Sequence, residues 1–173
     1  MTTALTIALR ILHIGAGVSW AGSVFLFVVL IQPSAAAVGP AATPFLLELL
    51  GRRRLVHWLL GLGGATVLGG LLLYLQDASE QGGLGQFVTS PFGLVLLVGA
   101  VSATTALCIG FFGIRPNVAR LLSLAASAAT PNPALGREIA VVQQRLKLLA
   151  RISLVLIGIA VLAMASAREL TGS

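Results

Sequence analysis

The chain of 173 residues is 57% hydrophobic and only 9% charged, whereas soluble domains average about 25% charged residues. This composition excludes an ordinary soluble domain and indicates a chain that folds in lipid. The net charge of +6 does not indicate nucleic-acid binding. The basic residues flank apolar segments, where they set topology and contact anionic lipid headgroups.

The first two membrane spans are predicted at residues 5–31 and 54–75, each around an apolar run of 21 residues. A helix of that length crosses a hydrocarbon core about 30 Å thick. The first run exceeds the h-region of a secretory signal, so we expect a retained span rather than a cleaved leader. Proline disfavours continued helix, so the first span should end at Pro33.

The third and fourth spans are predicted at residues 91–114 and 150–168. Between them, residues 117–129 and 135–150 carry apolar stripes at helical spacing, separated by a proline-rich break at 131–133. The fold class that we expect is all-α. It is an integral membrane four-helix bundle in one domain, residues 1–173, with a cytoplasmic helical hairpin that extends spans three and four.

Basic residues also predict the orientation. Nine of the eleven Lys and Arg residues lie in or beside the first and third loops, and the second loop has none. The positive-inside rule then predicts a multi-pass protein of the inner (plasma) membrane, with loops 1 and 3 cytoplasmic and both termini extracytoplasmic. The nine residues are Arg52, Arg53, Arg54, Arg115, Arg120, Arg137, Arg145, Lys147 and Arg151.

The chain has two histidines, His13 and His57, and each lies inside an apolar run. A histidine there is costly, so it normally faces the bundle interior and marks a site. Three- and four-residue spacing places Gly17 and Trp20 on the helix face of His13. His57 begins a ladder of small residues that we expect to face a neighbouring helix or a flat cofactor. The ladder consists of His57, Gly61, Ala65 and Gly69.

Depth argues against one iron held by both histidines. Each lies about eight positions, or about 12 Å, from the middle of its run, on opposite sides of the membrane. Their expected separation is therefore about 24 Å. Met164 is expected in the leaflet of His13 and Cys108 in that of His57, and both pairs use ligand types that bind haem or copper. Arg10 could neutralise a lipid phosphate or a cofactor carboxylate.

Each candidate residue also has a structural interpretation. His13 could be a buried, hydrogen-bonded residue without a ligand. His57 could be an ordinary amphipathic side chain at the membrane boundary. Met164 and Cys108 could simply pack in the bundle.

The segment Leu9-Arg10-Ile11-Leu12-His13, followed by Trp20 and Gly22, resembles the first helix of the copper-resistance-D-like membrane superfamily. That group includes haem-containing oxidases of the HemJ type. The resemblance implies a four-helix membrane protein that binds haem b or handles copper, with His13 as a ligand. HemJ-type members use a lysine in a later span, whereas the apolar regions of spans three and four here contain none.

The leading expectation is a haem b-binding membrane protein in electron transfer, as part of a larger membrane complex. One alternative is a cofactor-free structural or assembly subunit, packed against other subunits or a second copy of itself, and another is a copper permease. No enzyme motif is present, and enzymatic activity stays open. The expected cofactor-binding residues are Arg10, His13, Gly17, Trp20 and Met164, and the candidate metal ligands are His13 and His57.

Overall fold

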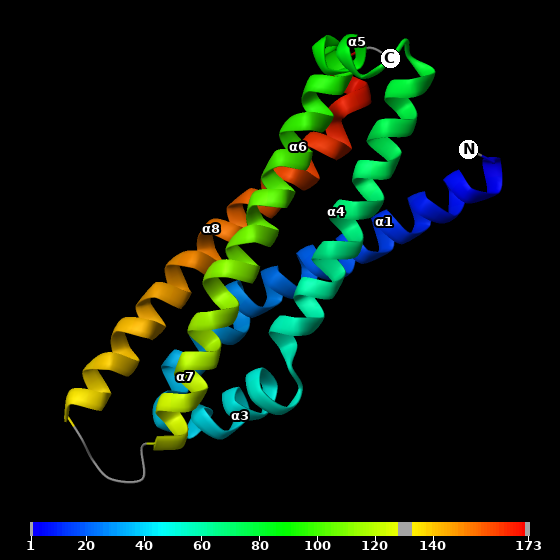
Figure 1. Ribbon diagram of the computed structural model, residues 1–173. Helices are drawn as coiled ribbons and strands as arrows, with labels where there is room; N and C mark the ends of the chain where they lie inside the picture. Colours follow the sequence, from blue (N-terminus) through cyan, green and yellow to red (C-terminus); the bar gives the residue numbers. More distant parts are fainter. Residues whose placement is uncertain (1, 128–132, 172–173) are drawn as a thin grey trace.

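The computed structural model describes residues 2–127 and 133–171, which contain helices and no strands. Four helical segments are long and apolar enough to cross a membrane: Thr3–Arg52, Leu55–Glu80, Pro91–Ser127 and Pro133–Ala167. Figure 1 shows them arranged as an elongated bundle. The expected fold class, an all-α membrane bundle, is confirmed, and the chain is a multi-pass membrane protein.

The first segment is longer than the sequence predicts. Helix α1 (Thr3–Phe25) continues through a π-helical stretch, η1 (Leu26–Ile31), into α2 (Gln32–Val38). The expected stop at Pro33 is therefore wrong. The Gln32 N–H donates to the Phe27 carbonyl, five residues back, and this wider turn accommodates a proline that would clash in a regular α-helix. The chain then turns through η2 (Gly39–Ala42), α3 (Thr43–Leu47) and η3 (Glu48–Arg52).

The second and third segments are joined at the opposite end. Helix α4 (Leu55–Glu80) is followed by the short α5 (Leu84–Thr89) and by α6 (Pro91–Cys108). Pro91 occupies the first turn of α6, where its missing N–H costs nothing, and the Ser90 hydroxyl accepts from the Gly93 N–H. Tyr74 donates its hydroxyl hydrogen to the Gly93 carbonyl (3.2 Å), which ties the end of α4 to the start of α6.

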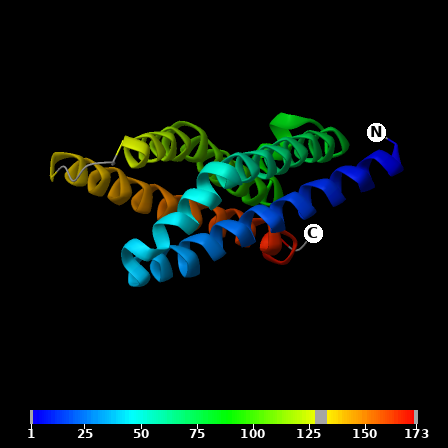
Figure 2. The same ribbon diagram turned by 90° about the horizontal axis from the view of Figure 1, so that it is seen from below.

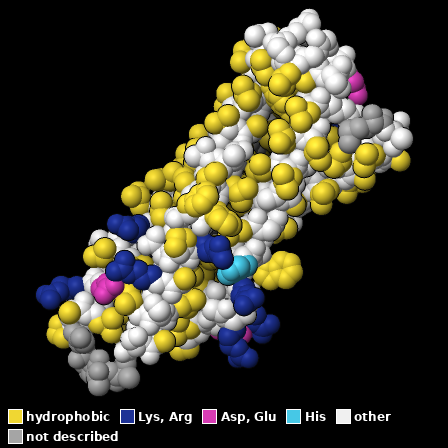
Figure 3. All heavy atoms as spheres, viewed as in Figure 1, with side chains coloured by type: hydrophobic (Ala, Val, Ile, Leu, Met, Phe, Trp, Pro, Cys, Tyr) yellow, Lys and Arg dark blue, Asp and Glu magenta, His cyan; other side chains and the backbone are white. Residues whose placement is uncertain are grey.

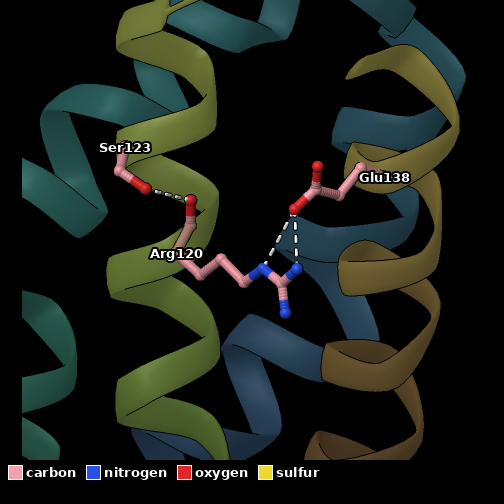
Figure 4. Close-up of polar contacts among 3 residues, drawn as sticks. All are labelled: Arg120, Ser123 and Glu138. Carbon is pink, nitrogen blue, oxygen red and sulfur yellow. Dashed lines mark hydrogen bonds and ion pairs between the residues drawn. The ribbon is translucent and has the colours of Figure 1, made fainter. Parts of the chain in front are cut away.

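The predicted helical hairpin is present in the described residues. Helix α6 continues through η4 (Ile109–Ile114) into α7 (Arg115–Ser127), and α8 (Pro133–Thr171) returns along it. Arg120 donates from Nε and Nη2 to the same carboxylate oxygen of Glu138 (3.2 and 2.7 Å) (Figure 4). The Ser123 hydroxyl donates to the backbone carbonyl oxygen of Arg120 (2.8 Å). The predicted end of the first hairpin helix, at residue 129, lies outside the described residues.

The bundle consists of two tightly packed helix pairs, α1 with α4 and α6 with α8, joined through α4 and α6. Its core forms where the pairs meet, around Trp20, Val24, Ala103, Ala106, Ile157 and Ala160. Both chain ends lie at one end of the bundle, opposite α3 and the α7/α8 hairpin (Figures 1 and 2). Lys and Arg side chains gather over the α3 and hairpin end, and hydrophobic side chains cover the middle (Figure 3).

Candidate functional site

Antiparallel pairing of α1 with α4 forms the surroundings of His13. The pairing begins at Thr6, whose hydroxyl exchanges hydrogen bonds with the Gln76 side chain (3.0 and 3.1 Å). It continues through His13, which lies against Gly69, and Gly17, which lies against Thr66. Contacts therefore advance along the two helices in opposite directions at nearly equal steps, as close packing over several turns requires. Small residues on α4 permit this close approach.

The His13 ring makes a specific polar contact with α4. Its Nδ1 lies 2.7 Å from the carbonyl oxygen of Thr66. A carbonyl only accepts, so Nδ1 carries the hydrogen, and in the neutral ring Nε2 keeps its lone pair. The ring rests on Gly70, where an added Cβ would lie 2.6 Å from His13 Cε1. Glycine at this position therefore makes room for the imidazole.

Trp20 lies two turns further along α1 and is only 6% exposed. Its ring packs on Gly63, where an added Cβ would lie 2.9 Å from Trp20 Cε2 and 3.1 Å from Leu107 Cδ1. Gly17 lies between His13 and Trp20 on α1. A Cβ added at Gly17 would lie 3.3 Å from Thr66 Cγ2, so the glycine permits close packing of Thr66. The predicted face of His13, Gly17 and Trp20 therefore packs directly on α4.

The other residues predicted around a cofactor lie elsewhere. Met164 packs against α6, with its Cγ 3.4 Å from the position that a Cβ would take at Gly99. Arg10 is exposed, one turn before His13. The hydrogen bond and the glycine contacts of His13 are with Thr66, Gly69 and Gly70, all on α4.

Sequence reasoning missed the partners of His13, namely Thr66 and Gly70. Thr66 is 7% exposed, and its own hydroxyl donates back to the Leu62 carbonyl (2.8 Å). The Thr66 hydroxyl is therefore hydrogen-bonded within α4, and the Thr66 backbone carbonyl accepts the hydrogen bond from His13. A lone threonine in the apolar run of α4 could have indicated a polar contact, but no side-chain pattern predicts which carbonyl is used.

The small-residue ladder does not face one neighbour along its length. His57 and Gly61 are exposed, Ala65 is half-buried and Gly69 is buried. The reason is geometric: a four-residue step advances about 40° beyond a full turn, so three steps turn the ladder by about 120°. The ladder therefore winds from the surface at His57 to the α1 interface at Gly69, and the expectation that His57 faces the interior is wrong.

Separate positions for the two histidines follow from the helix register. His13 contacts α4 at Gly69, and the twelve residues from His57 to Gly69 rise about 18 Å. This is shorter than the expected 24 Å, because His13 pairs nearer the middle of α4. The distance is still too great for two ligands of one iron. Cys108 is exposed, and in the described part of the chain no three His, Cys, Asp or Glu side chains group together.

A small apolar cavity of about 80 Å³ lies in the bundle beside Trp20. Two of the three π-helical stretches in the described residues contribute to its wall, η1 through Phe27 and η4 through Gly110. Ser153 also lines it, is 4% exposed, and its Oγ has no hydrogen-bond partner among the described residues. The cavity is about half the size of one that holds benzene, and it contains no candidate metal ligand.

Neither a protein-family model, nor a curated protein, nor a solved structure matches the chain. Functional inference therefore depends on the chemistry of the residues described above.

Proposed function

We propose that this chain is a haem b-binding integral membrane protein of electron transfer, with His13 Nε2 as the protein ligand to iron. The observation that supports this proposal is the 2.7 Å contact between His13 Nδ1 and the Thr66 carbonyl oxygen. Histidines that ligate metals almost always donate their other ring N–H to a carbonyl or carboxylate, which fixes the tautomer and the ring orientation. The resemblance of residues 9–22 to the copper-resistance-D-like first helix supports the same ligand.

The residues around His13 fit a haem ligand in three respects. The carbonyl contact leaves Nε2 as the atom with a free lone pair. Gly69 and Gly70 hold the imidazole closely against α4, so its orientation is fixed before any group binds. The His13 side chain is half-buried rather than enclosed by the chain. When bound, haem b would supply one-electron iron chemistry.

The residues around His13 have different roles in this proposal. The Thr66 carbonyl orients the imidazole and fixes its tautomer. Trp20, Gly63 and the core below them exclude water from the middle of the bundle. We propose His13 as the protein ligand and assign no ligand role to Met164, whose Cγ packs 3.4 Å from the Cβ position of Gly99 on α6.

An absorption spectrum of purified protein, with haem supplied during expression, tests the proposal. A Soret band is expected in the wild type and in His57→Ala, whereas His13→Ala should lose or shift it. External imidazole should restore the band to His13→Ala if that variant is folded and lacks only its ligand. Wild-type protein without haem would overturn the proposal, and loss of the band in both variants with folding preserved would contradict the separation of the two sites.

We also propose the orientation that the basic residues predict, with α3 and the α7/α8 hairpin in the cytoplasm and both termini outside. The clustering of Lys and Arg at that end of the bundle supports it (Figure 3). Reporter fusions after Gln81 should report the extracytoplasmic side, and fusions between α7 and α8 the cytoplasm. Reversed reporter signals would overturn the orientation without affecting the haem proposal.

The second candidate is a cofactor-free structural subunit of a membrane complex. One observation favours it: the His13 ring is packed and hydrogen-bonded to α4 by the chain alone. A wild type that binds neither haem nor metal would support this function. No observation favours the copper permease.

A further inference from the structure

A surface hollow lies at the start of α4, away from His13. It has a volume of about 420 Å³ and is lined by Arg54, His57, Trp58, Gly61 and Leu62, which we call the basic hollow. Trp58 is 71% exposed, and no atom lies within 4 Å of the position that a Cβ would take at Gly61. The hollow is therefore open to the surroundings of the protein and has a floor of bare backbone.

Charge is unevenly distributed around this hollow. Of the three consecutive arginines, Arg52 and Arg53 pair with Glu48 at 3.4 and 3.0 Å. Arg54 has no carboxylate partner among the described residues, and it is the arginine that lines the hollow. Its uncompensated charge, in the same lining as His57, favours an anion at the upper end of the hollow.

Position along α4 identifies the kind of anion. Arg54 immediately precedes the apolar span, which begins at Leu55. We therefore expect its guanidinium at the level where lipid headgroups meet hydrocarbon. Gly61 and Leu62 lie about 10 to 12 Å deeper along the helix. The hollow is therefore cationic at headgroup depth and apolar at acyl-chain depth, with the amphipathic Trp58 ring between the two levels.

We propose that the basic hollow binds one anionic phospholipid. Its phosphate lies at Arg54 and His57, and an acyl chain lies along Gly61 and Leu62 beside the Trp58 ring. A free phosphate would use only the upper half of the hollow, and a zwitterionic lipid would bring a second cation to the unpaired arginine. This inference does not depend on haem binding at His13.

Trp58 provides the measurement, because the other tryptophan, Trp20, is 6% exposed. The full-length protein is reconstituted in phosphatidylcholine vesicles that contain a brominated-chain lipid, either phosphatidylglycerol or phosphatidylcholine. Subtracting the signal of Trp58→Phe isolates the quenching of Trp58. We expect the anionic lipid to occupy the site about fivefold more readily than the zwitterionic one, the preference that one arginine at a membrane surface provides. Addition of 0.5 M NaCl should reduce this preference in the wild type.

Variants separate a bound lipid from general attraction to a basic protein. Arg54→Gln should bring the preference close to one, whereas Arg137→Gln, which removes the same charge from the exposed hairpin, should leave it unchanged. Gly61→Leu should lower quenching by filling the floor of the hollow. Inorganic phosphate at constant ionic strength should not compete.

Three results would overturn the proposal. One is equal quenching of the wild type by the two lipids. Another is an equal loss of preference in Arg54→Gln and Arg137→Gln, which would show only a diffuse charge effect. The third is competition by inorganic phosphate, which would identify a site for the free anion. The comparison of the two lipids and the phosphate competition use the wild type alone, so they test the proposal even if a variant fails to fold.

Discussion

The α1/α4 interface and the basic hollow each contain a histidine, a tryptophan and a glycine. At the interface, His13 bonds to Thr66, and Trp20 packs on Gly63. In the hollow, His57 and Trp58 are exposed and Gly61 has open space before it. Both sets lie in apolar spans of similar hydropathy, so composition cannot distinguish them. The comparison shows that contact with a second helix decides what such residues do.

The largest single loss of stability is expected at Trp20, and it contrasts with a small effect at Trp58. Trp20→Ala should lower the free energy of unfolding by about 3 kcal/mol, whereas Trp58→Ala should change it by less than about 0.5 kcal/mol. The loss at Trp20 lies at the lower end of the range for buried tryptophans, because lipid is as apolar as the core and only packing is lost. Unfolding in mixed micelles with SDS as denaturant measures both. Equal effects would show that Trp20 is not part of a packed core.

The two glycines should respond with opposite signs. Gly63→Ala adds a Cβ 2.9 Å from the rigid Trp20 ring and should destabilise the protein by about 2 kcal/mol, because overpacking forces the helices apart. Gly61→Ala meets no atom and should stabilise α4 by up to about 1 kcal/mol, the difference in helix propensity between glycine and alanine. The same SDS titration measures both changes. Destabilisation by Gly61→Ala would show that the hollow is closed by another segment.

Hydropathy, proline positions and charge were enough to predict the four spans, their order and the helical hairpin. These features depend on local composition and on the length of apolar runs, which any sequence displays directly. The continuation of α1 beyond Pro33 could not be predicted, because it depends on a π-helical turn that no side chain specifies. Local sequence indicates where a helix is discouraged but not whether a wider turn relieves the clash.

The face of each predicted site residue was harder to predict than its span. Spacing from His13 correctly grouped Gly17 and Trp20, because the three lie within about two turns. The four-residue ladder from His57 failed, since its drift of about 40° per step accumulates over three steps. The side-chain pattern could not predict that the backbone carbonyl of Thr66 would be the hydrogen-bond partner of His13.

The smallest expected difference is between the two histidines in the absence of any cofactor. His13→Ala removes an interhelical hydrogen bond, which in membrane proteins contributes about 0.6 kcal/mol on average, together with packing on Gly70. We expect a total loss of about 1 kcal/mol in the SDS titration of haem-free protein, and less than about 0.5 kcal/mol for His57→Ala.

His13→Asn offers a second test, because the Asn amide N–H can donate to the Thr66 carbonyl while making less packing contact than the imidazole. Recovery of about half the loss in this variant would assign that half to the hydrogen bond. Identical stabilities of His13→Ala and the wild type would mean that the Thr66 contact contributes nothing without a ligand. In that case the polar contact would orient the imidazole rather than stabilise the bundle, which would strengthen the proposal that His13 is a ligand.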